Sequence, residues 1–525
     1  MWKLASKRLA CIVAFSLIPV AFRLALLPWI PPPQPGIQDE FSYLLAGDTY
    51  ASGRLTNMPH RYWVFFESVH IIQQPSYMSK YPPLTGLILA FGQRLFGQPW
   101  IGILLSMGVL CGALAWAVGE WMPPFWTVIV SALAVLKIGI LSYWSEGYWG
   151  GTGAAIGGAL LIGSLPGILR RRTFLSGLPA AVGVALLANS RPFEGLLLTV
   201  LSLGYVAWRF AGQSTKSANR YRRLIRAVAA PLVVVMVPVG AWMAYYNFRV
   251  TGSALVMPYV AHERQYEGAS PFVWGGNGPS LTYRHEALRQ AWVDWELRKK
   301  SVMREHFLLT RSLFLWWLSE FYLGIPLTIL VVACARLTLK GRRTRAPMWL
   351  AILFLLGLNV ELGIFPHYAA PATALFFILA AGALRWLRHW RTRRPWIASM
   401  AYRVSLICVV AQLTAAPFWP EHRFFYDRRD FQAERARVVA FLNALPGKQL
   451  VFVRYGPMHD INHEWVYNRA NIDASTVVWA RSMGQEKDVA LIAYFKDRQV
   501  WLLDENGPAR IASYPRELSL GRKSF

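Results

Sequence analysis

Charged residues are scarce in this 525-residue chain. Asp, Glu, Lys and Arg together make up only 16% of the sequence, against roughly 25% in an ordinary soluble protein, whereas 55% is hydrophobic. A water-soluble surface for a chain of this length needs more charge than this. The composition therefore excludes an ordinary soluble enzyme and indicates that long apolar stretches face lipid.

Cysteine is scarce as well. The four cysteines are Cys11, Cys111, Cys334 and Cys408, and each lies inside an apolar stretch. No two of them lie in a polar segment, so no disulfide framework is expected and cysteine usage says nothing about compartment. We interpret them as helix-packing residues.

Acidic residues are half as frequent as basic ones, 28 against 55, which gives a net charge of +27. So basic a chain could bind nucleic acid, but its Lys and Arg residues fall between apolar stretches, on one predicted side of a membrane. The short connections on the other side contain Arg191 as their single Lys or Arg. This asymmetry follows the positive-inside rule and predicts a cytoplasmic N-terminus, contact with anionic membrane lipids and no nucleic-acid partner. The basic segments are 3–8, 170–172, 209–226, 336–345 and 385–403, and the connections are 144–150, 189–195 and 366–368.

Apolar runs recur at the length of about 20 residues that crosses a bilayer core of about 30 Å. The first is too long for a signal peptide and no small-x-small cleavage site follows it, so we interpret it as an uncleaved span. An odd number of spans places the C-terminal tail outside. The sequence thus predicts a polytopic α-helical protein of the inner membrane with about eleven spans: 9–30, 99–119, 123–143, 151–169, 173–190, 194–210, 227–247, 316–337, 346–365, 367–387 and 400–419.

Two long outer loops, 31–98 and 248–315, are expected to belong to a transmembrane domain covering residues 1–419. In the first loop, Pro82–Gly97 is apolar but short and contains Gln93 and Arg94, which favours an interfacial helix. The second loop contains a polar, helix-prone stretch at 282–304. The tail, 420–525, predicts a small extracytoplasmic α/β domain with a helix at 433–445 and strands at 449–455, 476–480, 489–494 and 499–503.

Asp39 and Glu40 lie where the chain leaves the first span, and Lys80 follows in the same outer loop. An acidic pair beside a span is costly unless it serves a polar site. A carboxylate can act as general base when an acceptor hydroxyl attacks an anomeric carbon, and a Lys ammonium can hold a phosphate. The alternatives are a hydrated pair that caps the next helix and a Lys whose ammonium reaches the head-group layer.

Other predicted outer connections contain further candidate substrate-binding residues. Glu146 and Tyr148 could bind a sugar or a divalent cation, or belong to an interfacial aromatic belt. Arg191 could bind phosphate, or form a structural pair with Glu194. His367 and Tyr368 lie at the same predicted face, where a structural His is the alternative.

A metal site is also conceivable in the tail. His459 and His463 are four residues apart, a spacing that can bind a metal on a helix. The preceding Gly456-Pro457 argues against a regular helix there. We predict no metal site and no cofactor, with a divalent cation left as an alternative.

The order of these motifs resembles the GT-C membrane glycosyltransferases, in the branch of the protein O-mannosyltransferases and lipid A aminoarabinose transferases. The resemblance implies a GT-C-like fold, with Asp39 as the base, Lys80 and Arg191 near the donor phosphate and Glu146 as a second acidic residue. Tyr81, inserted between Lys80 and the two prolines, and Glu146 in place of the more usual Asp depart from the pattern. The matching motifs are Asp39-Glu40, Ala51-Ser52-Gly53, Lys80-Tyr81-Pro82-Pro83-Leu84 and Leu95-Phe96-Gly97.

The resemblance implies transfer of a sugar from a polyprenyl-phosphate donor to an extracytoplasmic lipid, glycan or protein, with inversion at the anomeric carbon. Two alternatives stay open. One is another lipid-linked-glycan enzyme, a ligase or phosphotransferase. The other is a transporter, which should place ionisable residues in mid-span and contain paired broken helices, whereas the acidic residues here cluster at outer ends.

The charge distribution makes the topology testable. We expect a reporter that is active only outside the cytoplasm to be active when fused after Phe525, because an odd number of spans separates the two termini. The same reporter inserted in the basic segment 336–345 serves as control and should be silent. A tail fusion that is active only with a cytoplasmic reporter would show that the topology is inverted.

Overall fold

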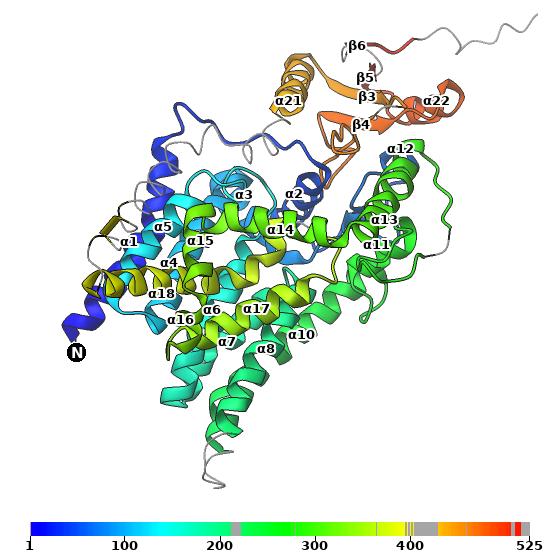
Figure 1. The fold of residues 1–525 in the computed structure, drawn as a ribbon. Coiled ribbons are helices and arrows are strands. Elements are labelled where there is room, and N and C mark those ends of the chain that lie inside the picture. Colours follow the sequence, from blue (N-terminus) through cyan, green and yellow to red (C-terminus); the bar gives the residue numbers. More distant parts are fainter. Residues whose placement is uncertain are drawn as a thin grey trace, which may run out of the picture.

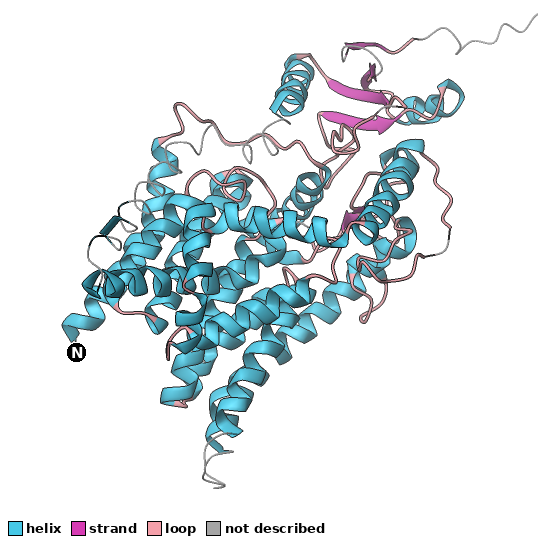
Figure 2. Cartoon of the chain, in the orientation of Figure 1, coloured by secondary structure: helices cyan, strands magenta, loops and turns pink. Residues whose placement is uncertain are grey.

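A computed structural model describes residues 2–211, 222–278, 280–363, 365–393, 429–457, 459–505 and 510–515, with residues 396, 399, 400 and 403 between them. A large helical body is joined by a small domain that contains a β-sheet (Figures 1 and 2). The small domain lies beyond one end of the body, next to α2 (Gln38–Ala51) and α12 (Glu286–Arg289).

In the part of the chain that the structure describes, six helical segments are long and apolar enough to cross a membrane. A seventh span is possible if α14 (Phe307–Tyr322) and α15 (Ile325–Ala333), bent by 107° at their junction, cross together. The fold is that of a multi-pass membrane protein. The six segments contain α1 (Trp2–Ala25), α4 (Pro99–Trp121), α6 (Thr152–Arg171), α8 (Pro192–Ala211), α10 (Ala230–Thr251) and α18 (Thr373–Arg393).

Nine of the first ten predicted spans overlap an apolar helix, whereas the eighth, 316–337, covers the bend between α14 and α15. Nearly all of the eleventh, 400–419, lies outside the described residues. Three of the ten are short, namely α5 (Pro124–Ala134), α7 (Phe174–Ala188) and α17 (Arg345–Leu358). The longest is Pro124–Gly139, because the 11 residues of α5 continue without a break into the 5 residues of η2 (Val135–Gly139). At a rise of about 1.5 Å per residue it covers roughly 24 Å, less than a bilayer core of about 30 Å. The number of spans therefore stays a prediction.

The core of the helical body is formed by α4, α6 and α18, whose apolar side chains are mostly buried, whereas α10 is mostly exposed. At one contact the helices approach so closely that only glycine fits. A β-carbon on Gly158 of α6 would lie 1.8 Å from the carbonyl oxygen of Pro371. This contact holds the short 3-10 helix η5 (Pro366–Ala372), which contains His367 and Tyr368, against α6.

The two long segments predicted to lie outside, 31–98 and 248–315, which keep the name outer segments below, fold as short elements between the spans. In the first, η1 (Trp63–Phe66) and the small β1 (Ile71–Ile72) and β2 (Met78–Ser79) hairpin precede α3 (Pro83–Phe96). The helix predicted at Pro82–Gly97 is confirmed as α3, while its position at the membrane interface stays a prediction. The helix-prone stretch of the second segment is confirmed as α12, η4 and α13. The second segment contains α11 (Pro258–Tyr266), α12, η4 (Gln290–Leu297) and α13 (Arg298–Glu305).

The C-terminal domain has a four-stranded sheet in the order β4-β3-β5-β6, with β5 and β6 antiparallel and the other pairs parallel. The predicted strand at 489–494 is wrong, because these residues belong to α22 (Gln485–Tyr494). Two parallel strands need a crossover between them, and α22 supplies it between β4 and β5. The domain's elements are α21 (Arg429–Ala444), β3 (Lys448–Arg454), β4 (Val477–Arg481), α22, β5 (Arg498–Asp504) and β6 (Arg510–Ser513).

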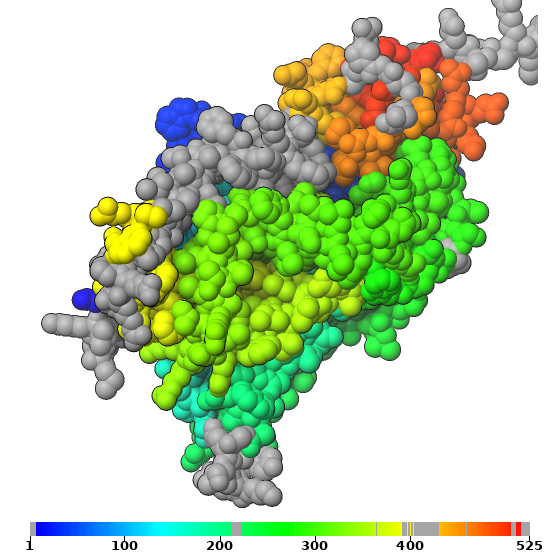
Figure 3. Space-filling view, in the orientation of Figure 1, coloured from blue at the N-terminus to red at the C-terminus, as the bar shows by residue number. Residues whose placement is uncertain are grey.

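The C-terminal domain packs closely on the helical body (Figure 3). Asp48 of α2 accepts hydrogen bonds from the Arg469 side chain at 2.7 Å and from the Ala470 amide at 2.8 Å. Apolar side chains of the first outer segment, Phe65 and Ile71, share a buried cluster with residues of the sheet. The domain is thus fixed to the helix that carries Asp39. A boundary at 419/420 falls among residues outside the described part of the chain.

Candidate active site

The start of α2 is held by Glu40. One carboxylate oxygen accepts hydrogen bonds from the amides of Gly36 and Ile37 at 2.8 and 3.3 Å, and the other from the amide of Tyr148 at 3.0 Å. The Glu40 residue is only 3% exposed. A carboxylate in the first turn satisfies free amides and complements the positive end of the helix dipole. Glu40 therefore fixes the direction in which the side chain of its neighbour, Asp39, projects from α2.

Asp39 lies beside three other side chains of the outer segment. The Tyr81 hydroxyl donates to its Oδ1 atom, and His70 Nε2 lies 3.8 Å from the same oxygen. The Tyr43 ring stacks on Tyr81, with ring centres 4.4 Å apart. Burial raises the pKa of Tyr81 well above its ordinary value, so the hydroxyl keeps its proton. The Asp39 side chain is 25% exposed and thus accessible to a substrate.

Lys80 follows β2 and is almost completely buried, at 2% exposure. Its ammonium lies 2.7 Å from Glu267 Oε1. It also lies over three aromatic rings, 5.5 Å from Tyr81, 4.7 Å from Tyr259 and 5.2 Å from Trp292, which is cation–π geometry. Aromatic faces and one carboxylate thus replace water around the charge.

Glu267, the partner of Lys80, is itself buried between charged groups. Burial alone would raise the pKa of this carboxyl, but the Lys80 ammonium and the hydrogen bond from His262 lower it to about 2. Burial lowers the pKa of His262 to about 4, against the opposing effect of Glu267. At neutral pH Glu267 is therefore a carboxylate and His262 a neutral imidazole.

Arg191 and Tyr368 approach the same region from the helical body. The Arg191 guanidinium lies 4.6 Å from the Tyr368 ring centre and 3.3 Å from Glu194 Oε1. Burial raises the pKa of Tyr43 on α2, and the neighbouring Arg191 charge opposes this shift. The structure therefore brings Asp39 and Lys80 to the same side chain, Tyr81, which stacks on Tyr43, and it pairs Arg191 with Tyr368.

Three other predicted residues, Glu146, Tyr148 and His367, form hydrogen bonds with other parts of the protein. Both oxygens of Glu146 accept from the Arg23 guanidinium, at 2.6 and 2.9 Å, which ties the 144–150 connection to α1. The Tyr148 hydroxyl donates to the Pro33 carbonyl at 2.9 Å. His367 Nδ1 lies 3.2 Å from the Tyr143 hydroxyl. Glu146 and Tyr148 thus hold the 144–150 connection in place, and the Tyr148 amide in turn binds Glu40 at the start of α2.

Sequence reasoning missed four residues of the site, namely His70, Tyr259, Glu267 and Trp292. His70 belongs to no motif, and the other three come from the second outer segment, about 180 residues or more beyond Lys80 in the chain. No local spacing links such distant positions. Tyr81 was noted only as an insertion, and its contact with Asp39 explains a tyrosine at that position.

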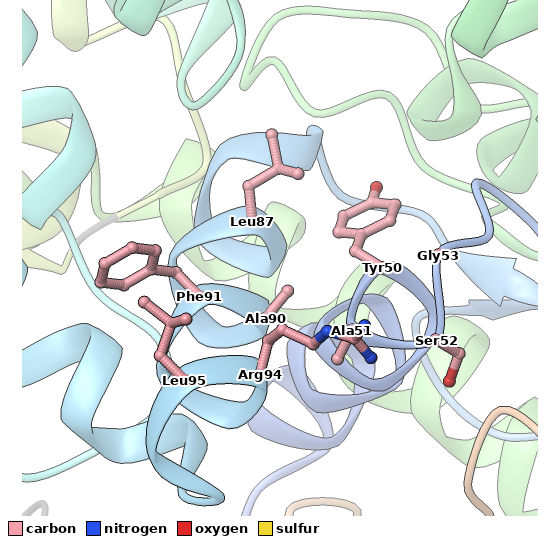
Figure 4. Close-up of a pocket in the computed structure, with 9 residues that line it drawn as sticks. All are labelled: Tyr50, Ala51, Ser52, Gly53, Leu87, Ala90, Phe91, Arg94 and Leu95. Carbon is pink, nitrogen blue, oxygen red and sulfur yellow. The ribbon is translucent and has the colours of Figure 1, made fainter.

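The Ala51-Ser52-Gly53 motif lines a pocket of about 460 Å³ between the end of α2 and α3 (Figure 4). Arg94 provides its one charged side chain and the remaining lining is mostly apolar. At about 1.5 Å per residue, the length of α2 separates this pocket from Asp39 by roughly 18 Å. The motif therefore lies outside the group of side chains around Asp39. The lining residues are Tyr50, Ala51, Ser52, Gly53, Leu87, Ala90, Phe91, Arg94 and Leu95.

No group of three or more His, Cys, Asp or Glu side chains suited to a metal ion occurs among the described residues. The two histidines of the tail point to different partners. His459 Nδ1 lies 2.7 Å from Glu505, and the His463 ring stacks on Phe431. They lie in an irregular segment after β3, as Gly456-Pro457 led us to expect.

No known protein family and no curated protein matches the sequence. Among solved structures, the chain is similar to ArnT from Cupriavidus metallidurans bound to undecaprenyl phosphate, with a TM-score of 0.51 and 11% identity over 96% of this chain and 93% of that one. The apo state of the same ArnT gives a TM-score of 0.50 and 12% identity over 95% and 93%. The oligosaccharyltransferase of Archaeoglobus fulgidus gives 0.47 and 11% over 85% and 62%.

ArnT, a lipid A aminoarabinose transferase, belongs to the GT-C superfamily. The similarity to ArnT extends over nearly the whole of both chains, including the helical body and the outer segments. The GT-C-like fold expected from the sequence motifs is therefore confirmed.

The buried histidines predict a dependence of stability on pH. Burial, with Arg481 and Arg284 nearby, lowers the pKa of His285 to about 4. Between pH 6.5 and 4 the unfolded chain binds a proton that the folded chain does not, so the free energy of unfolding falls as pH falls. We expect the melting temperature in detergent to decrease from pH 7 to 4.5, and less so in His285→Gln, whose amide can still donate to the Val64 carbonyl.

The exposed His306 provides the matched control for this measurement. His306→Gln should show the wild-type dependence on pH. Equal slopes in all three proteins would contradict the assignment of His285 as a neutral buried imidazole.

Proposed function

We propose that this protein is a glycosyltransferase that moves a sugar from a polyprenyl-phosphate donor to an extracytoplasmic acceptor. The observation that carries the proposal is the position of Asp39, a partly exposed carboxylate that accepts from Tyr81, whose ring centre lies 5.5 Å from the Lys80 ammonium. The GT-C fold supports it, since a structure with this fold was solved bound to undecaprenyl phosphate.

The proposed reaction is a single displacement. The oxygen of the acceptor hydroxyl attacks the anomeric carbon while Asp39 takes the proton of that hydroxyl. The bond from the anomeric carbon to the phosphate oxygen breaks. The lipid phosphate leaves as an anion, so no general acid is needed. Attack from the side opposite the leaving group inverts the configuration of the sugar.

Lys80 and Arg191 are assigned to the donor phosphate. A cation near the leaving group stabilises the charge that grows on it in the transition state. Lys80 already lies against Glu267, so the phosphate has to share or displace that carboxylate. The aromatic rings around Lys80 keep the ammonium in place in either case.

The remaining predicted residues take supporting roles in this proposal. Glu40, with three backbone amides on its carboxylate, holds Asp39 in position. Glu146 and Tyr148 hold the 144–150 connection that packs against Glu40. Tyr368, whose ring lies under Arg191, is assigned to the substrate, as is His367 beside it. A divalent cation is not needed for any of these steps.

A doubly labelled donor separates this proposal from its alternatives. The purified protein in lipid vesicles is given a polyprenyl-phosphate sugar with one label on the sugar and a second on phosphorus, plus cell-envelope fractions. Sugar transfer moves the first label to the acceptor and leaves the second on the lipid. Movement of both labels to the acceptor indicates a phosphotransferase, and movement of intact donor between leaflets indicates a transporter.

The base is tested by Asp39→Asn. General-base catalysis contributes about 10²- to 10⁴-fold, so we expect turnover to fall by that factor while the protein stays folded. Asp497→Asn, an exposed carboxylate of the C-terminal domain, is the matched control and should keep full activity. Turnover above about a tenth of wild type in Asp39→Asn would remove Asp39 from the role of base.

The phosphate clamp is tested by Lys80→Ala, which should weaken donor binding and also slow transfer. Lys80→Arg should restore only part of both, because a planar guanidinium presents a different geometry from a point charge. Donor titration and turnover in the same lipid measure the two effects. Lys448→Ala, an exposed lysine, is the control.

Removing Lys80 alone leaves the buried Glu267 carboxylate with its hydrogen bond from the neutral His262 but without a counter-charge, which destabilises the fold. The double variant Lys80→Met/Glu267→Gln removes both charges and keeps the side-chain volumes similar. It should fold and still bind donor weakly. Unchanged donor affinity and turnover in this variant would end the assignment and leave Arg191 as the phosphate ligand.

A further inference from the structure

His70 has an unusual backbone for a residue with a side chain. Its φ of 66° lies in the left-handed region, which few residues other than glycine adopt. Its carbonyl oxygen accepts from the Ser42 hydroxyl at 2.7 Å and from the Lys80 amide at 3.2 Å. These two bonds hold the strained residue between α2 and β2. Strain of this kind persists where the surrounding structure enforces it, and it clusters at functional sites.

The side chain of His70 faces Asp39. Nε2 lies 3.8 Å from Asp39 Oδ1, and the ring is packed against Tyr81 and Trp292 with ring centres 5.6 and 5.4 Å apart. Nδ1 is buried and has no hydrogen-bond partner among the described residues. Nε2 therefore faces the carboxylate that is proposed to act as base.

The protonation state of His70 follows from its surroundings. Burial holds the pKa of the imidazole well below its ordinary value, and nearby positive charges lower it further. The ring is therefore neutral and carries a single N–H. A carboxylate stabilises that proton on the nitrogen that faces it, Nε2. The titratable and charged groups around the ring are Asp39, Lys80 and Tyr81 of the first outer segment, and His262 and Lys299 of the second.

We propose that His70 is a positioning residue for Asp39, with Nε2–H donating to Oδ1 beside the Tyr81 hydroxyl. Two donors on Oδ1 fix the rotation of the carboxylate and leave Oδ2 as the atom that takes the acceptor's proton. A small rotation of the two side chains closes the distance of 3.8 Å to hydrogen-bond length, so the proposed contact does not depend on bound substrate. This inference deepens the proposed function and rests on it.

Two variants of equal length separate this role from simple packing. His70→Gln keeps an amide donor close to the position of Nε2, whereas His70→Met fills similar space without a donor. Both keep a side chain at the same strained backbone position, so any cost in stability is shared. His70→Gly relieves the strain and removes the donor, which controls for folding.

The first measurement needs no substrate. A carbodiimide modifies protonated carboxyl groups, and mass spectrometry reports the labelled fraction of Asp39 at each pH. Loss of one hydrogen bond to a carboxylate favours its protonated form, so the pH of half-maximal labelling should rise by about one unit in His70→Met and His70→Gly. In His70→Gln it should stay close to the wild-type value.

The second measurement is turnover. We expect kcat to fall about 10- to 100-fold in His70→Met, with the KM for donor changed less than about threefold, and to recover in His70→Gln. Equal labelling curves and equal kcat in the Gln and Met variants would overturn the proposal and leave His70 as a packing residue. If the wild-type protein transfers no sugar, the proposed function fails, and the labelling still decides whether His70 contacts Asp39.

Discussion

Compensation of buried charge is the constraint on which the packing of the two outer segments, the 144–150 connection and the C-terminal domain depends. A buried ion that loses its partner costs about 3–5 kcal/mol, so each ion has to meet its counterion as the chain folds. Lys80 meets Glu267 at 2.7 Å, Arg23 meets Glu146 at 2.6 Å, and Arg481 meets Glu464 at 2.7 Å. The first two pairs join segments more than 100 residues apart in the sequence. The first pair fixes the two outer segments to each other, and the second fixes the 144–150 connection to α1.

The same constraint separates two kinds of acidic residue at the membrane boundary. Glu40 and Glu146 look as suited to chemistry as Asp39 does, but their oxygens bind backbone amides and a guanidinium. Asp39 keeps a quarter of its side chain exposed and receives a tyrosine hydroxyl on one oxygen. The hydrogen-bond partners of a carboxylate therefore indicate whether it has a structural role or is available to a substrate.

Much of the helical body could be predicted from the sequence, because hydropathy over about 20 residues is a local property. The neighbourhood of Asp39, Lys80 and Arg191 was also predicted, since charge asymmetry placed all three on one side. Glu267 and Trp292 could not be, because their contacts with Lys80 depend on how two distant loops fold. The prediction of a strand at 489–494 was wrong because these β-prone residues form part of the crossover helix α22. The parallel sheet requires such a helix, and the local sequence does not indicate it.

The contact between α2 and the C-terminal domain has a consequence for the synthesis of the chain. Asp48 receives Arg469 and the Ala470 amide from residues made more than 400 positions later. A ribosome that stops before residue 469 releases a product with every apolar helix of the described body but without these two partners for α2. Two hydrogen bonds to the helix that carries Asp39 therefore come from residues that are synthesised after every apolar helix of the described body.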